Sequence, residues 1–145
     1  MTDSTNRPVA SRLIAAALLR QGNRYLFIKQ NKEGGAYPDR LHIPGGGVDV
    51  GETPLEAVQR EVLEEVGIEL DDFLPVDFAW DTLMYKGAMT VLVFCRFVAD
   101  IPEGVEPRPS SDAEEIVWLE QEALLTGNHN SSTLSLFRTL NLVPE

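Results

Sequence analysis

Residues 46–68 of the chain, GGVDVGETPLEAVQREVLEEVGI, join a glycine-rich segment to the best-defined helix in the sequence. Thr53 can close the start of this helix with a capping box, and Pro54 suits its first position. Gly67 suits the left-handed residue that commonly follows a helix. The spacing therefore predicts a helix over Pro54–Val66 with both ends specified.

A helical wheel of this segment separates an apolar stripe from an acidic one. The stripe expected to pack on a sheet consists of Leu55, Val58, Val62 and Val66. The neighbouring arc carries Glu61, Glu64 and Glu65, with Glu65 nearest the apolar edge. The pattern predicts three carboxylates that project beside the core.

These carboxylates contradict two local rules of helix stability. Like charges at spacings of three and four residues repel, and acids in the last turn oppose the helix dipole. At about 5 Å and an effective dielectric of about 20, each pair repels by on the order of 3 kcal/mol, which a bound divalent cation would reverse. Such a combination points to function. A solvated acidic surface is the alternative interpretation.

The remaining sequence predicts strands and short helices around this segment. Strands are expected at 12–20, 24–30, 73–82, 89–98 and 115–119, with a short apolar piece at 41–43. Short helices are expected at 120–125 and 132–140. The first two strands form a hairpin through Gln21–Asn23, and a Pro-rich acidic loop covers 100–112.

Length and charge restrict the classes of protein. The chain has 145 residues, which fits a flexible tail at 1–8 and a single domain at 9–145. Its formal net charge of −11 disfavours binding to nucleic acid. Cys95 is the only cysteine and lies in an apolar stretch, so we expect a buried thiol and no cysteine-based metal site. The apolar run Leu13–Leu19 is too short to span a membrane, so a cytoplasmic protein is expected.

Read by spacing, segment 46–68 resembles the signature of the Nudix hydrolases at all nine specified positions. They are Gly46, Glu52, Arg60, Glu61, Val62, Glu64, Glu65, Gly67 and Ile68. The flanks are also similar, with Pro44–Gly46 after a hairpin and Trp118 on a late strand. The resemblance implies an α+β fold, an α/β/α sandwich with a central mixed β-sheet and a loop-helix-loop catalytic motif.

The resemblance also assigns roles to residues. It implies Mg²⁺, or Mn²⁺, as cofactor, held by Glu61, Glu64, Glu65 and the carbonyl of Gly45. It implies catalytic roles for Glu52, Arg60, Glu64 and Glu65, with Arg60 paired to Glu52 so that the carboxylates stay oriented. Substrate contacts are expected from Gly46, Gly47, Lys29 and Tyr85.

The implied reaction is hydrolysis of a phosphoanhydride in a nucleoside diphosphate linked to another group, by attack of a metal-activated water. A nucleoside triphosphate, a dinucleoside polyphosphate and a nucleotide sugar all satisfy this description. Glu64 and Glu65 are candidates for the general base. Three acidic residues of the loop before the last strand are also candidates: Asp112, Glu114 and Glu115.

Outside the signature the residues suggest substrate contacts less specifically. Tyr37, Phe78 and Trp80 could stack on a nucleobase, although burial is the preferred interpretation of Phe78 and Trp80 because they share one face of a strand. Three further cations flank the segment: Lys32, Arg40 and Lys86. His42 and His129 lack a second ligand at zinc spacing.

Other functions remain open at this point. A module on the same fold could sense a nucleotide without hydrolysing it. An isomerase on this fold would need a reactive cysteine, for which Cys95 is poorly placed, and RNA decapping conflicts with the acidic charge. Members of the family often dimerise, so a homodimer and a monomer both stay open.

Overall fold

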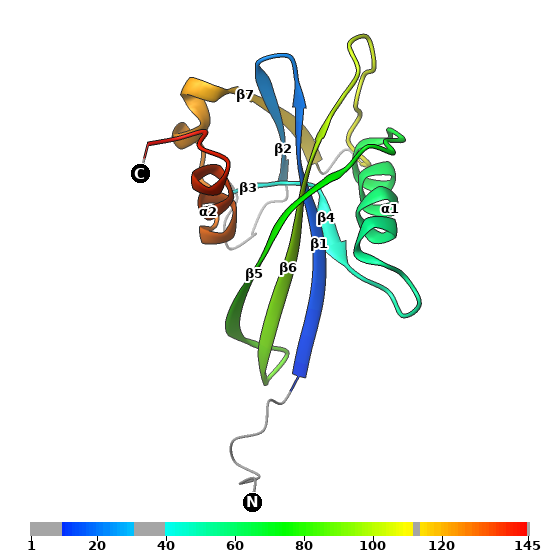
Figure 1. Ribbon diagram of the computed structural model, residues 1–145, viewed down its shortest axis with the longest axis vertical. Helices are drawn as coiled ribbons and strands as arrows, with labels where there is room; N and C mark the ends of the chain where they lie inside the picture. Colours follow the sequence, from blue (N-terminus) through cyan, green and yellow to red (C-terminus); the bar gives the residue numbers. More distant parts are fainter. Residues whose placement is uncertain (1–9, 31–39, 112–113, 145) are drawn as a thin grey trace, which may run out of the picture.

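The computed structural model describes residues 10–30, 40–111 and 114–144, which form a mixed sheet with a helix on each face (Figure 1). The strands are β1 (Ala10–Gln21), β2 (Arg24–Gln30), β3 (Leu41–His42), β4 (Gly45–Gly47), β5 (Leu74–Tyr85), β6 (Ala88–Asp100) and β7 (Glu114–Glu120). The helices are α1 (Pro54–Val66), the 3₁₀ helix η2 (Gln121–Thr126) and α2 (Ser131–Thr139). The predicted tail and the predicted roles of Lys32, Tyr37 and Asp112 lie outside the described residues.

The sheet has the strand order β3-β2-β1-β6-β5, with β4 paired to β1 and β7 paired to β2. The pairing of β1 with β6 is parallel over eleven registered positions from Ala10↔Thr90 to Arg20↔Asp100. The other pairings are antiparallel. The predicted mixed sheet between helices is therefore confirmed.

Helix α1 begins and ends where the sequence predicts. The Thr53 hydroxyl accepts a hydrogen bond from the Glu56 amide at 3.1 Å, and the Glu56 carboxylate accepts one from the Thr53 amide at 2.9 Å. Gly67 has φ 73° and its amide donates to Leu63 O, which closes the last turn. Local sequence is therefore sufficient to set the length of this helix.

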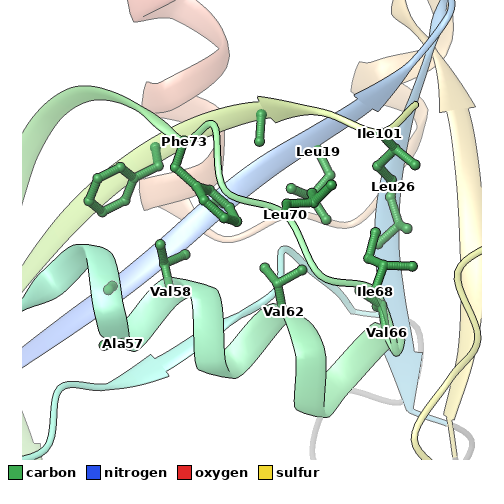
Figure 2. Packing of buried hydrophobic residues seen from close by; sticks show 14 of the residues in the cluster. Leu19, Leu26, Ala57, Val58, Val62, Val66, Ile68, Leu70, Phe73 and Ile101 are labelled. Atoms are coloured by element: carbon green, nitrogen blue, oxygen red, sulfur yellow. The ribbon is translucent and has the colours of Figure 1, made fainter. Parts of the chain in front are cut away.

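Helix α1 packs on one face of the sheet with Val58, Val62 and Val66, all fully buried (Figure 2). They lie against residues of the sheet and the segment after α1, including Leu19, Leu26, Ile68, Leu70, Phe73 and Ile101. Leu55 does not join them, since it is 40% exposed, and that prediction is wrong. Fully buried Ala57 lies on the wheel near Glu61 instead, so the buried side of α1 reaches into the acidic arc.

Helix α2 covers the opposite face of the sheet (Figure 1). Leu136 and Phe137 of α2 are fully buried in a second cluster, together with Phe27 of β2 and Leu124 of η2. Two separate apolar clusters thus hold α1 and α2 on opposite faces of the same sheet. None of the described helices is long and apolar enough to cross a membrane.

The glycine triplet forms strand β4, which the sequence analysis did not predict. Gly45 and Gly47 pair with Ala16 and Ile14 of β1. The approach is so close that a Cβ added to Gly45 would lie 2.5 Å from Ala15 O. Only glycine fits at position 45. This explains why a segment with the composition of a loop forms a strand.

Strands β5 and β6 extend as a long hairpin whose tip lies near the start of β1 (Figure 1). Phe78 and Trp80 do share one face of β5, but they are 69% and 68% exposed, so the prediction of burial is wrong. Neither helix covers this part of the hairpin face (Figure 1). Cys95 of β6 packs against the core as predicted, but it is half-buried rather than buried.

Candidate active site

The acidic arc of α1 faces β4, and a glycine makes this contact possible. A Cβ added to Gly46 would lie 2.5 Å from Oε1 of Glu61. The Glu61 side chain is only 16% exposed as a result. Gly46 therefore has a definite function in the fold, because it leaves room for a carboxylate between α1 and the sheet.

Arg60 lies where α1, β4 and the loop between them meet, and it binds several carboxylates at once. Its Nε and Nη2 donate to the two oxygens of Glu52 at 2.7 and 3.0 Å, and the predicted Arg60–Glu52 pair is thus present. Nη1 donates to Glu61 at 2.9 Å and lies 3.4 Å from Glu64. Nη2 also donates to the carbonyl of Gly47 at 3.1 Å. Arg60 thereby ties α1, β4 and the connecting loop together.

The same contacts fix the ionisation of Glu52. Hydrogen bonds from Arg60, and then from the Asp49 amide at 2.9 Å, lower the pKa of Glu52 to about 2. The pKa of Arg60 is raised, first of all by its hydrogen bond to Glu52. This bidentate pair stays charged throughout the neutral range and is suited to hold the loop in one geometry.

Glu65 has a different environment, in which the charged form is disfavoured. Burial, the side-chain hydrogen bond and negative charge of Glu61, and the charge of Glu114 together raise its pKa to about 8. The Gly45 amide opposes this shift by donating to Glu65 Oε1 at 2.9 Å. Gly45 thus contacts the acidic cluster through its amide, and the role predicted for its carbonyl stays a prediction.

The site carries more negative charge than its cation balances. Arg60 forms ion pairs with four carboxylates, those of Asp49, Glu52, Glu61 and Glu64. Glu65 lies beside this group with its pKa raised by Glu61. Hard oxygen donors in excess over nearby cations are the donor set that Mg²⁺ and Mn²⁺ prefer. The residues present therefore fit a divalent cation.

The carboxylates are nevertheless not arranged as a finished metal site. Among residues 10–30, 40–111 and 114–144, no three His, Cys, Asp or Glu side chains are grouped so that they could hold a metal ion. The Arg60 guanidinium contacts both Glu61 and Glu64, and Glu64 is 57% exposed. Ligation would require the Glu64 side chain to rotate from Arg60 toward Glu61 and Glu65.

The acidic residues that begin β7 differ in their relation to this cluster. Glu114 raises the pKa of Glu65 and opposes the lowering of the His42 pKa, which burial and the charge of Arg40 cause. Glu115 lies 3.9 Å from Lys29, so this predicted substrate contact already faces a carboxylate. Of the two, Glu114 is the one whose charge reaches the acidic cluster.

A groove runs from the glycine strand along the face of the sheet that α2 covers. A cavity of about 120 Å³ reaches Gly45 and His42 and is closed by Ile14, Ala16, Ile43, Phe94, Arg96, Asn130, Ser132 and Thr133. A larger one of about 880 Å³ shares Phe94, Asn130 and Ser132 with it and continues to Trp80 and Leu83. No local sequence pattern indicates this groove, because it depends on segments far apart in the chain.

The structure does not bring every residue predicted to contact substrate to the acidic cluster and β4. Tyr85, whose side chain lies outside the described set, ends β5 at the tip of the hairpin, and Lys86 follows it. The tip is level with the start of β1 rather than with Ile14–Ala16, which pair with the glycine strand. A third cavity, of about 500 Å³ around Leu18 and Tyr25, lies elsewhere and has none of the acidic residues of α1 in its lining.

Comparisons with known proteins agree on one family. The family model described as "NUDIX domain" matches residues 10–140. An 8-oxo-dGTP diphosphatase of Haemophilus influenzae is 28% identical over 88% of this chain and 89% of its own length. The nucleoside triphosphatase NudI of an Enterobacter species is 25% identical over 91% and 98%. The crystal structure of a MutT NUDIX hydrolase from Burkholderia pseudomallei has a TM-score of 0.70 and 24% identity, and the match covers 92% of this chain and 98% of that one.

Proposed function

We propose, from the premise that this chain belongs to the Nudix hydrolase family, that it is a Mg²⁺-dependent pyrophosphohydrolase of nucleoside triphosphates. The observation that carries the proposal is the excess of carboxylates around Arg60 and Glu65 at the glycine strand. Excess carboxylates cost stability in the metal-free protein, and a divalent cation with its phosphate ligands would offset that cost.

The substrate class is chosen from the relatives. Of the relatives compared above, one is named for 8-oxo-dGTP and another for nucleoside triphosphates, and both are covered over most of their length. Tyr85, one of the predicted substrate contacts, ends its strand at the tip of the hairpin. A triphosphate is therefore preferred over the dinucleoside polyphosphates and nucleotide sugars that the signature also allows.

Within this proposal the charged residues of the site have three different roles. Glu61, Glu64 and Glu65 would hold Mg²⁺ or Mn²⁺, which when bound offsets phosphate charge and lowers the pKa of a coordinated water. Glu52 and Arg60 orient these carboxylates through their bidentate pair. Glu114 is the preferred general base, because its charge already acts on Glu65 and it begins a strand fixed to β2 at Gln30.

The groove on the α2 face is proposed to hold the nucleoside. It begins at Gly45, whose amide binds Glu65, so a substrate with its phosphates at the carboxylates can continue into it. Asn130 at the start of α2 uses its side-chain oxygen to cap Thr133, which leaves its amide nitrogen to face a base.

A hydrolysis screen with product identification tests the proposal. The full-length chain is incubated with dGTP, 8-oxo-dGTP, the other nucleoside triphosphates, a dinucleoside tetraphosphate, ADP-ribose and a nucleotide sugar, each with Mg²⁺ or with EDTA. We expect a nucleoside monophosphate and pyrophosphate from a triphosphate with Mg²⁺ alone. Cleavage of another class would correct the substrate, and metal-dependent binding without turnover would favour a nucleotide-sensing module instead.

A further inference from the structure

An apolar strip of sheet surface lies exposed on the face of the sheet that carries α1. Strands β1, β6 and β5 are neighbours in the sheet, so their register defines rows of side chains that cross all three strands. Side chains of one row project from the same face. One row consists of Ala15, Cys95 and Phe78, and Ala15 is fully buried in the apolar cluster that holds α1. This row and every second row after it toward the hairpin tip therefore belong to the α1 face.

The cover over this face ends within two residues of Ala15. In the next row of the α1 face, Leu13 of β1 is 39% exposed and Trp80 of β5 is 68% exposed. The last row pairs Met84 with Met89, which are 61% and 48% exposed. We call the exposed apolar members of these rows the hairpin strip: Leu13, Phe78, Trp80, Met84 and Met89.

Charge is absent from the rows that build the hairpin strip. Their other members are Ser11, Thr82, Val91, Val93 and Cys95, none of which is charged. Asp77 and Asp81 of β5 alternate with the two aromatic residues, so they project from the opposite face. Because 24% of the residues in the chain are charged, an apolar surface without any charge is unusual for this sequence. Exposed apolar patches of this kind mark sites of association.

The size of the hairpin strip is sufficient for a small interface. Aromatic side chains bury about 150–250 Å² each, so the exposed two thirds of Phe78 and Trp80 alone offer roughly 200–330 Å². Adding Leu13, Met84 and Met89 brings the strip to on the order of 600 Å². Two such strips in contact would bury about 1,200 Å², which is the lower limit of a specific protein interface.

The chemistry of the hairpin strip favours a second copy of the chain as its partner. Two sheet faces pack well on each other at about 10 Å, with their side chains interdigitated. Two chains of net charge −11 repel, so a contact between them is most favourable where both surfaces lack charge. An anionic membrane surface would repel this chain. A peptide added to the edge of β5 would leave the side chains of the strip exposed.

We propose that two copies of this chain associate face to face through their hairpin strips, around a twofold axis, with Trp80 of each copy packed on the strip of the other. The association goes beyond the proposed function, since it requires neither a metal nor a nucleotide. An interface at the lower size limit predicts a dissociation constant on the order of micromolar.

Sedimentation velocity of the full-length chain, from about 1 to about 200 µM, tests this association. We expect monomers at the lowest concentration and dimers at the highest. Trp80→Ser is the test variant, and Leu125→Ser is the matched control, because Leu125 is a large apolar residue that is 55% exposed in η2, outside the strip. Trp80→Ser should raise the dissociation constant at least about tenfold, and Leu125→Ser should leave it unchanged. A monomer at every concentration, or equal effects of the two variants, would overturn the proposal.

Tryptophan fluorescence provides a test in which the strip itself stays intact. Trp118→Phe leaves Trp80 as the only tryptophan of the chain. As the concentration rises through the dissociation constant, emission from Trp80 should shift to shorter wavelength and acrylamide should quench it less. Quenching that stays efficient in the dimer would place Trp80 outside the interface and overturn the proposal. Shielding at every concentration would overturn it too, since another segment of the same chain, such as residues 1–9, would then cover the strip.

Discussion

Two arginines of this protein are surrounded by side chains of opposite charge, and they differ in balance. Arg96 is 3% exposed and meets one carboxylate, Asp77, through two hydrogen bonds of 2.7 Å. Its third nitrogen donates to the carbonyl of Ser132 and lies 3.3 Å from the Ser135 hydroxyl. Arg60 is 29% exposed and meets four carboxylates. The first cluster is neutral, and the second is strongly negative.

We interpret this difference as one between a structural ion pair and a proposed ligand site. In the Arg96 cluster every charge is matched and α2 is joined to the sheet, so nothing further is required. In the Arg60 cluster unmatched carboxylates lower the stability of the metal-free chain and raise the pKa of Glu65. Substitutions in the two clusters should therefore affect different properties.

The largest expected effect is on activity, from Glu61→Gln. This change removes a predicted ligand while keeping the shape of a side chain packed against Gly46. We expect kcat/KM for the triphosphate to fall by about 10³-fold, with the free energy of unfolding changed by less than about 1 kcal/mol. Steady-state kinetics and urea denaturation measure the two quantities. Loss of stability in proportion to activity would make Glu61 a structural residue.

The second largest effect is expected from Asp77→Asn in the Arg96 cluster, and it is an effect on stability. It leaves the nearly fully buried guanidinium of Arg96 without its counter-charge. We expect the free energy of unfolding to fall by about 3 kcal/mol, while kcat of the folded fraction changes little. Urea denaturation with two optical probes measures this. An unaffected stability would contradict the distinction between the clusters.

A smaller effect concerns pH in the absence of metal. The pKa of Glu65 is about 8 in the folded chain against an ordinary value of 4.5, so between these values the folded state holds a proton that the unfolded state has released. The contribution of Glu65 to stability should therefore be fully present below about pH 4.5 and be lost as the pH rises to about 8. Glu65→Gln should flatten this dependence and stabilise the chain by roughly 1 kcal/mol near pH 8. Thermal unfolding in EDTA across this range measures it, and an unchanged slope in the variant would count against the shift.

The smallest effect is expected from Ser135→Ala. The Ser135 hydroxyl is one partner among several of Arg96 and lies at 3.3 Å. Loss of a weak contact in a cluster that is otherwise complete should cost about 0.5 kcal/mol. A cost comparable to that of Asp77→Asn would show that the cluster depends on its hydroxyl as much as on its carboxylate. Chemical denaturation of both variants side by side decides this.

The sequence was sufficient to predict α1 and the arc that carries its glutamates, because capping and periodicity are local. Thr53 and Gly67 set the ends of α1, and the helical wheel placed Glu61, Glu64 and Glu65 on one arc. The identification of a Nudix hydrolase from the signature is confirmed by the family match. The ligand roles of these glutamates stay predictions that the variants above test.

What the sequence could not supply depends on contacts between distant segments. Gly45–Gly47 became a strand because β1 offers small residues at Ala15 and Ala16. Trp80 was expected in the core, but it is 68% exposed and belongs to neither apolar cluster of the described residues. The groove joins β1, β6 and the start of α2, and no local pattern marks such a meeting.

Titration of Mn²⁺ followed by electron paramagnetic resonance measures metal binding at the proposed cation site independently of turnover. The unaltered chain, Glu61→Gln and Ser135→Ala are compared at pH 7.5, the last being a control in the Arg96 cluster. The account predicts binding by the unaltered chain and by Ser135→Ala, and at least about tenfold weaker binding by Glu61→Gln. Equal binding by all three, or binding by none, would contradict the conclusion that the unbalanced carboxylates form a cation site.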